Sequence, residues 1–161
     1  MFIRTKRKCM VVMNIGLAVL AALWVSNYYR LAAVSGRSME PALSQGDIVV
    51  VRMGTLPQRG DVVVIDSKVL HKRIIKRVIA VEGDTVFVSD GEIWVNKEVL
   101  VEEYIKEPYE HDKGVWVVPP ESVYVLGDNR NHSRDSRVLG FIPLGEVTGT
   151  VMYPTNKFGG K

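Results

Sequence analysis

The sequence predicts an all-β domain of antiparallel strands, preceded by one N-terminal transmembrane helix. Three observations lead to this fold class. Residues 10–25 form an apolar run with one amide and no charge. After Leu31 the apolar residues change from helical to alternating spacing, in short runs separated by Gly, Pro or Asp. No long amphipathic helix is evident after Val34, so the body of the chain is expected to fold as antiparallel meanders.

The N-terminal segment is interpreted as an uncleaved membrane anchor. The run MVVMNIGLAVLAALWV follows a cluster of basic residues and precedes Tyr28 and Tyr29, which predicts a cytoplasmic N-terminus and an extracytoplasmic body. A cleaved signal peptide and a buried core helix are the alternatives. The run is longer than a typical signal core, and residues 21–24 (AALW) make a poor cleavage site. The expected organisation is a cytoplasmic tail over 1–9, an anchor over 10–29, a catalytic domain over 30–155 and a tail over 156–161.

Charge and cysteine content exclude several classes of function. The net charge of +3 is accounted for by the basic cluster at positions 4–8, so the domain offers no basic face for nucleic acid. Cys9 is the single cysteine, which excludes a disulfide within the chain and a Cys-x-x-Cys site. At the membrane edge Cys9 is either a plain apolar residue or a lipidation site. We expect no cofactor, and a monomer.

The predicted strands are short and rich in Val and Ile. Asp90-Gly91 is a strong hairpin signal between two of them, and residues 82–84 (EGD) form a second turn. The predicted ranges are Asp47–Arg52, Asp61–Asp66, Lys72–Val81, Thr85–Ser89, Ile93–Asn96, Val115–Val118, Ser122–Leu126 and Glu146–Met152.

Two residues are candidates for a catalytic pair. Ser38 lies in a turn between Gly36 and Pro41, which can hold a hydroxyl and its N–H in fixed positions; the alternative is that Ser38 caps this turn. Lys76 stands between aliphatic residues on a predicted strand, where burial would lower its pKa; the alternative is that it reaches the surface. A serine nucleophile with a neutral lysine as its base is a known variant of the serine-protease triad.

A third segment, residues 127–137 (GDNRNHSRDSR), is dense in short polar side chains. Such groups can orient a lysine amine and brace a loop. A calcium loop is the alternative, but Arg130 and His132 occupy positions where that loop needs oxygen ligands. His71, His111 and His132 lack metal-ligand spacing and are interpreted as surface residues. No metal site is expected.

The order of these motifs resembles that of the type I signal peptidases. The resemblance rests on SMEP at 38–41 behind an anchor, KRVIAVEGD at 76–84, GDNRNHSRDSR at 127–137 and GFIP at 140–143, and it runs to about Val151. The chain between Asp84 and Gly127 is compact, which resembles the minimal, single-anchor form. The resemblance implies a membrane-bound endopeptidase that cleaves N-terminal signal peptides from exported preproteins, with small residues such as Ala before the cut.

The resemblance also implies residue roles. Ser38 would be the nucleophile and Lys76 the general base, and the Ser38 N–H would bind the oxyanion. Ser133 would hydrogen-bond the lysine amine. Asp135 and Arg137 would form a structural ion pair, with Asp128, Asn129 and Arg77 supporting the site. Some members carry a serine at the position of Gly36 as a second oxyanion donor, which Gly36 cannot supply.

Two other functions compete with this prediction. One is an anchored β domain that binds a partner without catalysis, which the presence of both Ser38 and Lys76 disfavours. The other is a soluble, self-cleaving Ser–Lys regulator. That class is disfavoured because the sequence has no evident DNA-binding module or self-cleavage linker.

Overall fold

The structure is a computed structural model that describes residues 2–108 and 113–152, without the side chains of residues 2–9 and 11. His111 and the expected tail over 156–161 lie outside the described residues. The elements in chain order are α1 (Phe2–Tyr28), β1 (Tyr29–Ala33), β2 (Ile48–Met53), β3 (Val62–Ser67), β4 (Lys72–Val81), β5 (Thr85–Ser89), β6 (Glu92–Val95), β7 (Glu98–Val99), β8 (Gly114–Val117), β9 (Ser122–Leu126), η1 (Arg130–His132), α2 (Ser136–Leu139), β10 (Ile142–Pro143), η2 (Leu144–Glu146) and β11 (Val147–Met152).

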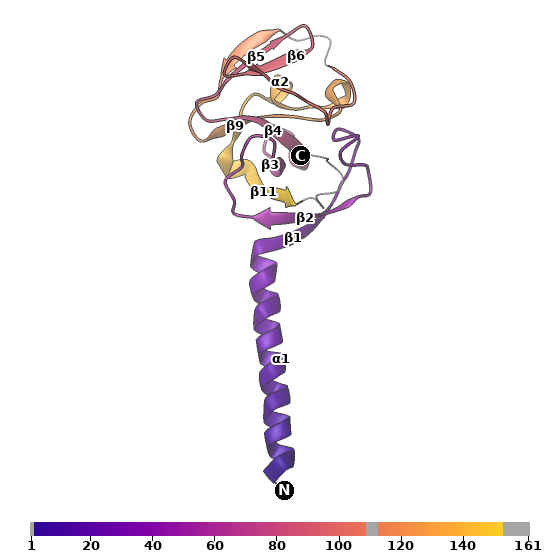
Figure 1. The fold of residues 1–161 in the computed structure, drawn as a ribbon, viewed down its shortest axis with the longest axis vertical. Helices are drawn as coiled ribbons and strands as arrows, with labels where there is room; N and C mark the ends of the chain where they lie inside the picture. Colours follow the sequence, from indigo (N-terminus) through magenta and orange to yellow (C-terminus); the bar gives the residue numbers. More distant parts are fainter. Residues whose placement is uncertain (1, 109–112, 153–161) are drawn as a thin grey trace.

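Two antiparallel sheets make up the body of the molecule, so the predicted β-rich, antiparallel class is confirmed. The larger sheet has seven strands in the order β1-β2-β11-β3-β4-β9-β10, and the smaller has four in the order β7-β6-β5-β8. In Figure 1 β1 and β2 adjoin α1, whereas β5 and β6 lie at the opposite end of the molecule. The two sheets share a core in which Ile79, Tyr124 and Leu126 pack with Val86 and Ile93.

The predicted strands correspond closely to those observed. Three of the eight have the predicted bounds, and the other five differ by one residue at one or both ends. The Asp90-Gly91 hairpin is also confirmed: both residues have positive φ values, 51° and 84°, and they connect the paired strands β5 and β6.

Strand β1 is the main element that the sequence did not reveal. Tyr29 was assigned to the anchor, yet it begins β1 and pairs with Arg52 of β2. The apolar residues of 29–33 continue the apolar helix without a Gly or Pro between them, so no local signal separates the two elements. The short β7 and β10 and the four-residue α2 were missed because two residues are too few to show a strand period and four are too few to show a helical one.

Helix α1 extends away from the sheets as an isolated rod (Figure 1). Its described apolar side chains are largely exposed, including Leu17, Leu20 and Trp24 at 67%, 66% and 61%, so the buried-core interpretation is wrong. Among the described residues, no helix combines the length and hydropathy needed to span a membrane.

Strand β4 is the element that organises the site. It lies between β3 and β9, with Lys76 opposite Val63 and Arg77 opposite Leu126. Strand β9 then leads directly into the polar segment 127–137. The fold therefore brings the second and third sequence motifs together through strand pairing.

Candidate active site

The Ser38 hydroxyl meets the Lys76 amine, although the two residues are 38 positions apart. Lys76 Nζ donates a hydrogen bond to Ser38 Oγ at 2.7 Å and another to the Ile75 carbonyl at 2.8 Å. Ser38 follows β1 in a turn whose own hydrogen bonds join backbone groups, such as Leu43 N to Met39 O. The hydroxyl therefore contacts the lysine, and no described helix begins at Ser38 for it to cap.

Lys76 does not extend to the surface. It is 3% exposed, and its neighbours on β4, Ile74 and Val78, are also buried. Desolvation disfavours the ammonium form and lowers the pKa of Lys76 from 10.5 to about 8. The carboxylates of Asp135 and Asp128 oppose this shift, and the charges of Lys72 and Arg137 add to it.

The shift has a direct chemical meaning. At pH 7 a lysine with the ordinary pKa is neutral in about three molecules in 10,000, whereas one with a pKa of about 8 is neutral in roughly one in ten. The hydrogen bond to Ser38 can then reverse, so that the neutral amine accepts the hydroxyl proton. The pair has the distance and the protonation equilibrium that a nucleophile and its base require.

The segment 127–137 holds the backbone around Ser38. Asn129 N donates to the Ser38 carbonyl and Asn129 Nδ2 donates to the Arg37 carbonyl, each at 3.1 Å. Gly127 lies against the same backbone. A Cβ on Gly127 would stand 2.5 Å from the Ser38 carbonyl oxygen and would also collide with the Ser133 side chain.

Replacing Gly127 with alanine is therefore expected to displace the Ser38 loop. The Ser38 carbonyl belongs to the backbone and cannot move aside as a flexible side chain does, so overpacking should destabilise the protein by about 1–3 kcal/mol and strongly reduce kcat. Gly145→Ala is the matched control, because a Cβ there meets no atom within 4 Å. Urea unfolding and peptide turnover measure both effects. Equal behaviour of the two variants would contradict the tight contact.

Ser133 differs from expectation. Its Oγ is buried and has no hydrogen-bond partner among the described residues. Among the described residues, the Lys76 amine donates to Ser38 and to the Ile75 carbonyl, and no hydrogen bond joins it to Ser133. Ser133 lies beside Gly127, within the segment 127–137 that holds the backbone around Ser38.

Asp135 and Arg137 form a buried ion pair, as the resemblance implied. Arg137 Nε donates to Asp135 Oδ1 at 2.8 Å and Arg137 Nη2 donates to Asp135 Oδ2 at 2.9 Å. Asp135 also accepts from Gly127 N at 2.9 Å, and Arg137 donates to the Arg130 carbonyl at 2.7 Å. The pair thus closes the segment 127–137 on itself.

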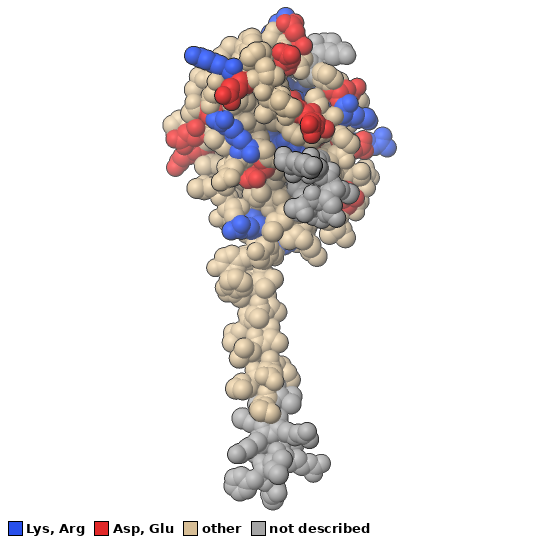
Figure 2. Space-filling view, viewed as in Figure 1, with Lys and Arg blue, Asp and Glu red and all other residues tan. Residues whose placement is uncertain are grey.

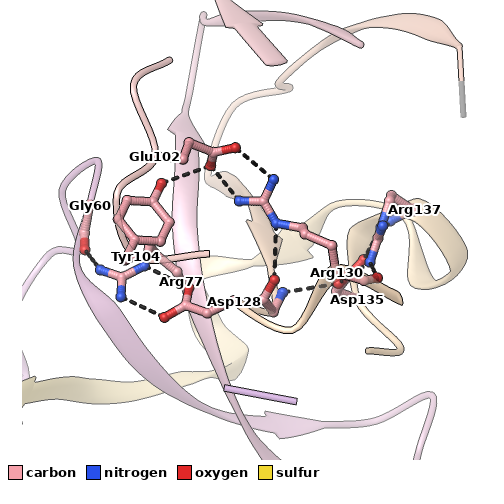
Figure 3. A network of polar contacts seen from close by, with 9 residues as sticks. Gly60, Arg77, Glu102, Tyr104, Asp128, Arg130, Asp135 and Arg137 are labelled. Carbon is pink, nitrogen blue, oxygen red and sulfur yellow. Dashed lines mark hydrogen bonds and ion pairs between the residues drawn. The ribbon is translucent and has the colours of Figure 1, made fainter. Parts of the chain in front are cut away.

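Arg77 and Asp128 form a second buried pair. Arg77 Nε donates to Asp128 Oδ1 at 2.8 Å and Arg77 Nη2 donates to Asp128 Oδ2 at 2.6 Å, with Asp128 fully buried. Arg77 also donates to the Gly60 carbonyl at 2.9 Å, and its guanidinium lies 3.9 Å from the centre of the Tyr104 ring. Figure 3 shows these contacts together with Arg130 and the Asp135–Arg137 pair of the segment 127–137.

Three members of this network were not predicted: Glu102, Tyr104 and Arg130. Arg130 is 1% exposed and its guanidinium forms a two-pronged ion pair with Glu102, to which the Tyr104 hydroxyl also donates at 2.8 Å (Figure 3). Arg130 belongs to the polar segment 127–137, which the sequence analysis had already singled out. Glu102 and Tyr104 lie in an irregular segment after β7, where no period or motif marks them.

A cleft of about 440 Å³ opens beside the pair. Its residues come from three segments: 32–38, which includes the end of β1, 64–76 along β3 and β4, and 132–134 in the polar loop. Gly36 lines the cleft at φ 90° with no atom near the position of a Cβ, so it offers no side-chain donor. Among the described residues, no group of three His, Cys, Asp or Glu side chains could hold a metal.

The sequence matches the family Signal peptidase, peptidase S26, over residues 7–155. A signal peptidase I of Leptolyngbya laminosa is 34% identical over 91% of this chain and 80% of that relative. One of Bacillus licheniformis is 33% identical over 88% of this chain and 86% of its own length.

The fold leads to the same family. The crystal structure of a signal peptidase I from Enterococcus faecalis V583 matches with a TM-score of 0.56 and 30% identity, over 61% of this chain and 98% of that chain. The chain therefore belongs to the signal peptidase family, peptidase S26, and is a serine protease of the signal peptidase I type.

Proposed function

We propose that this protein is a membrane-bound endopeptidase that removes N-terminal signal peptides from exported preproteins. Ser38 is the nucleophile and Lys76 the general base. The observation that supports this most directly is the 2.7 Å contact between Ser38 Oγ and the amine of Lys76, a residue that is 3% exposed, in a chain of the signal peptidase family. The proposed reaction needs no metal or other cofactor. One chain supplies both the Ser38 hydroxyl and the Lys76 amine, so a monomer is sufficient for it.

The proposed reaction has two stages. Neutral Lys76 accepts the Ser38 proton while Ser38 Oγ attacks the scissile carbonyl, and the resulting ammonium returns the proton to the leaving amine. In the second stage Lys76 takes a proton from water as the water oxygen attacks the acyl–enzyme carbonyl. The ester bond to Ser38 then breaks, Lys76 returns the proton to Ser38 Oγ, and the signal peptide leaves with a free carboxylate. The Ser38 N–H stabilises the oxyanion, an effect worth roughly 3–4 kcal/mol per donor in serine proteases. Gly36 has no side chain, so it cannot supply a second side-chain donor to the oxyanion.

The supporting residues act by holding this geometry. Asn129 fixes the Ser38 and Arg37 carbonyls, and the Asp135–Arg137 and Arg77–Asp128 pairs fix the segment that carries Asn129. Ala32 and Ala33 in the cleft wall leave an apolar surface against which small substrate residues such as Ala fit before the cut.

The composition of the N-terminal helix supports the membrane part of this proposal. Residues 10–28 carry no charge, their described apolar side chains are largely exposed, and the face of α1 in Figure 2 shows no charged group among its described residues. At 1.5 Å per residue this stretch measures about 28 Å, close to the hydrocarbon core of about 30 Å. We propose a cytoplasmic tail over 1–9, an anchor over 10–28 and an extracytoplasmic catalytic domain over 29–155, which begins with β1.

Purified full-length protein in neutral detergent tests the proposal. With a preprotein and with a peptide containing Ala-x-Ala, it should generate a new N-terminus directly after the second Ala, identified by mass spectrometry. Ser38→Ala is the blank for contaminating proteases. An unprocessed substrate would leave the non-catalytic anchored domain as the better function, and full release from membranes by carbonate would favour the soluble self-cleaving regulator.

The pH dependence is expected to follow the lysine. Because only the neutral amine accepts the Ser38 proton, kcat/KM should fall tenfold per pH unit below about pH 8 and level off above it. Rates with a peptide lacking titratable groups, measured from pH 6 to 10, give this profile. A plateau that extends down to pH 6 would exclude Lys76 as the base.

A further inference from the structure

In the part of the chain that the structure describes, the Lys and Arg side chains that line the cleft beside Ser38 have no acidic side chain among them. Its lining includes five Lys or Arg side chains, and none of its described lining residues is Asp or Glu. The whole chain has 21 basic and 18 acidic residues, so composition does not account for this one-sided lining. The five are Arg37, Lys72, Arg73, Lys76 and Arg134.

These cations have different surroundings. Lys76 is buried in the catalytic pair, and Arg73 Nε is 2.7 Å from Asp66 Oδ1, so neither is the main attraction for a ligand. Arg37 Nε is 3.9 Å from Glu40, a loose contact for a side chain that is 77% exposed. Lys72 and Arg134 are exposed at the cleft. The charge available to a ligand is thus concentrated on Arg37, Lys72 and Arg134.

Arg37, Lys72 and Arg134 lie along the path of a peptide that would cross the catalytic pair. Arg37 precedes Ser38 directly, and Arg134 follows Ser133. Lys72 lies four residues before Lys76 on β4, which is about 13 Å along a strand at 3.3 Å per residue. An extended substrate beside β4 covers that distance with about four residues.

We infer that this cleft selects polypeptides that carry acidic residues within about four positions of the cut bond. This inference rests on the proposed function and adds a charge preference to it. Opposite charges favour the encounter and the bound state, and a cleft of one sign strengthens that effect. Anionic lipid headgroups offer similar charge, but the cations share one cleft with the reacting atoms, which favours the peptide.

Matched peptides test the inference. Each contains Ala-x-Ala and a single glutamate, placed in turn at each position within four residues of the cut that the two Ala residues do not occupy, with glutamine at the same position as the control. In neutral detergent at about 20 mM salt, glutamate at one or more positions should raise kcat/KM by about 3–10-fold over glutamine, and about 0.5 M salt should remove most of the difference. Lys72→Gln combined with Arg134→Gln should lower this ratio clearly, with Arg37 as the remaining source of the preference.

Lys68→Gln is the control variant, because Lys68 is exposed and lies outside the cleft, and it should retain the wild-type ratio. Equal cleavage of glutamate and glutamine peptides at all positions would overturn the inference while leaving the proposed function intact. Failure to cut any peptide would instead overturn the proposed function. A ratio of one, with Lys72- and Arg134-dependent binding to phosphatidylglycerol vesicles, would assign the charge to lipid and overturn the peptide preference.

Discussion

Replacing Lys76 with methionine is expected to abolish cleavage and, at neutral pH, to make the protein more stable. Methionine fills a similar volume without a charge. Loss of the base should reduce kcat by at least about 10⁴-fold, as in other serine proteases. Burial of the ammonium lowers the pKa of Lys76 from 10.5 to about 8, which corresponds to a destabilisation of about 3 kcal/mol at pH 7. Methionine removes that cost, so the free energy of unfolding should rise by about 1–3 kcal/mol.

The sign of the pH dependence follows from the same shift. Between pH 8 and 10.5 the unfolded chain holds the lysine proton more often than the folded chain, so the wild-type protein gains stability as the pH rises. The advantage of methionine should therefore shrink by about 2 kcal/mol between pH 7 and pH 9.5. Urea unfolding of the full-length proteins in detergent at the two pH values measures it.

Lys68→Met is the matched control for this prediction. Lys68 is exposed near the end of the β3–β4 hairpin, so its replacement should leave turnover unchanged and shift stability by less than about 0.5 kcal/mol. A Lys76→Met protein that retains activity would show that another group is the base. One that is less stable than wild type at pH 7 would show that the hydrogen bonds of Lys76 outweigh the burial of its charge.

The contact between Ser38 and Lys76 could be anticipated because the combination of the two residue types is specific. Taken alone, Ser38 could be explained as the cap of a turn, and Lys76 as a residue that reaches the surface. Only their combination in one chain favoured catalysis. The sequence could not supply the second bond of the lysine, which goes to the Ile75 carbonyl, because that contact depends on how the side chain folds back along its own strand. The expected hydrogen bond with Ser133 is not formed, although the ammonium has a third N–H to donate, so the residue types alone did not determine which partners the amine takes.

The fold was predictable where runs rich in Val and Ile are bounded by turn residues, and unpredictable where they are not. Strands with alternating aliphatic residues, such as Thr85–Ser89, had the correct bounds. Strand β1 directly follows an apolar helix, and its identity depends on pairing with β2, which begins 15 residues after β1 ends (Ala33 to Ile48). Glu102 and Tyr104 depend on tertiary contacts alone, since Arg130 and Arg77 reach them from other parts of the chain.

Changing Asp128 to asparagine is expected to destabilise the protein severely. The substitution keeps the size of the side chain but leaves Arg77, with its side chain 8% exposed, as a buried charge without its carboxylate. Removing one partner of a buried ion pair typically lowers the free energy of unfolding by 3–5 kcal/mol. Because Asn129 follows directly and holds the Ser38 carbonyl, kcat should fall as well.

The same fold contains a matched control for this pair. Arg73 and Asp66 form an equivalent two-pronged contact at the surface, where the side chains are 60% and 55% exposed. Asp66→Asn should lower the free energy of unfolding by no more than about 1 kcal/mol, because water solvates the remaining guanidinium. Urea unfolding of both variants measures the difference, and equal losses would show that Arg77 is solvated in solution.

A double replacement separates the loss of the ion pair from the stranded charge. If the damage in Asp128→Asn comes from an uncompensated guanidinium, then Arg77→Met combined with Asp128→Leu should recover most of the lost stability, since neither charge remains to be desolvated. It also keeps the test decisive if Asp128→Asn fails to fold. A double variant as unstable as the single one would place the energy in the contacts of Arg77 with Gly60 and Tyr104 instead. The ion pair would then orient the loop rather than stabilise the fold.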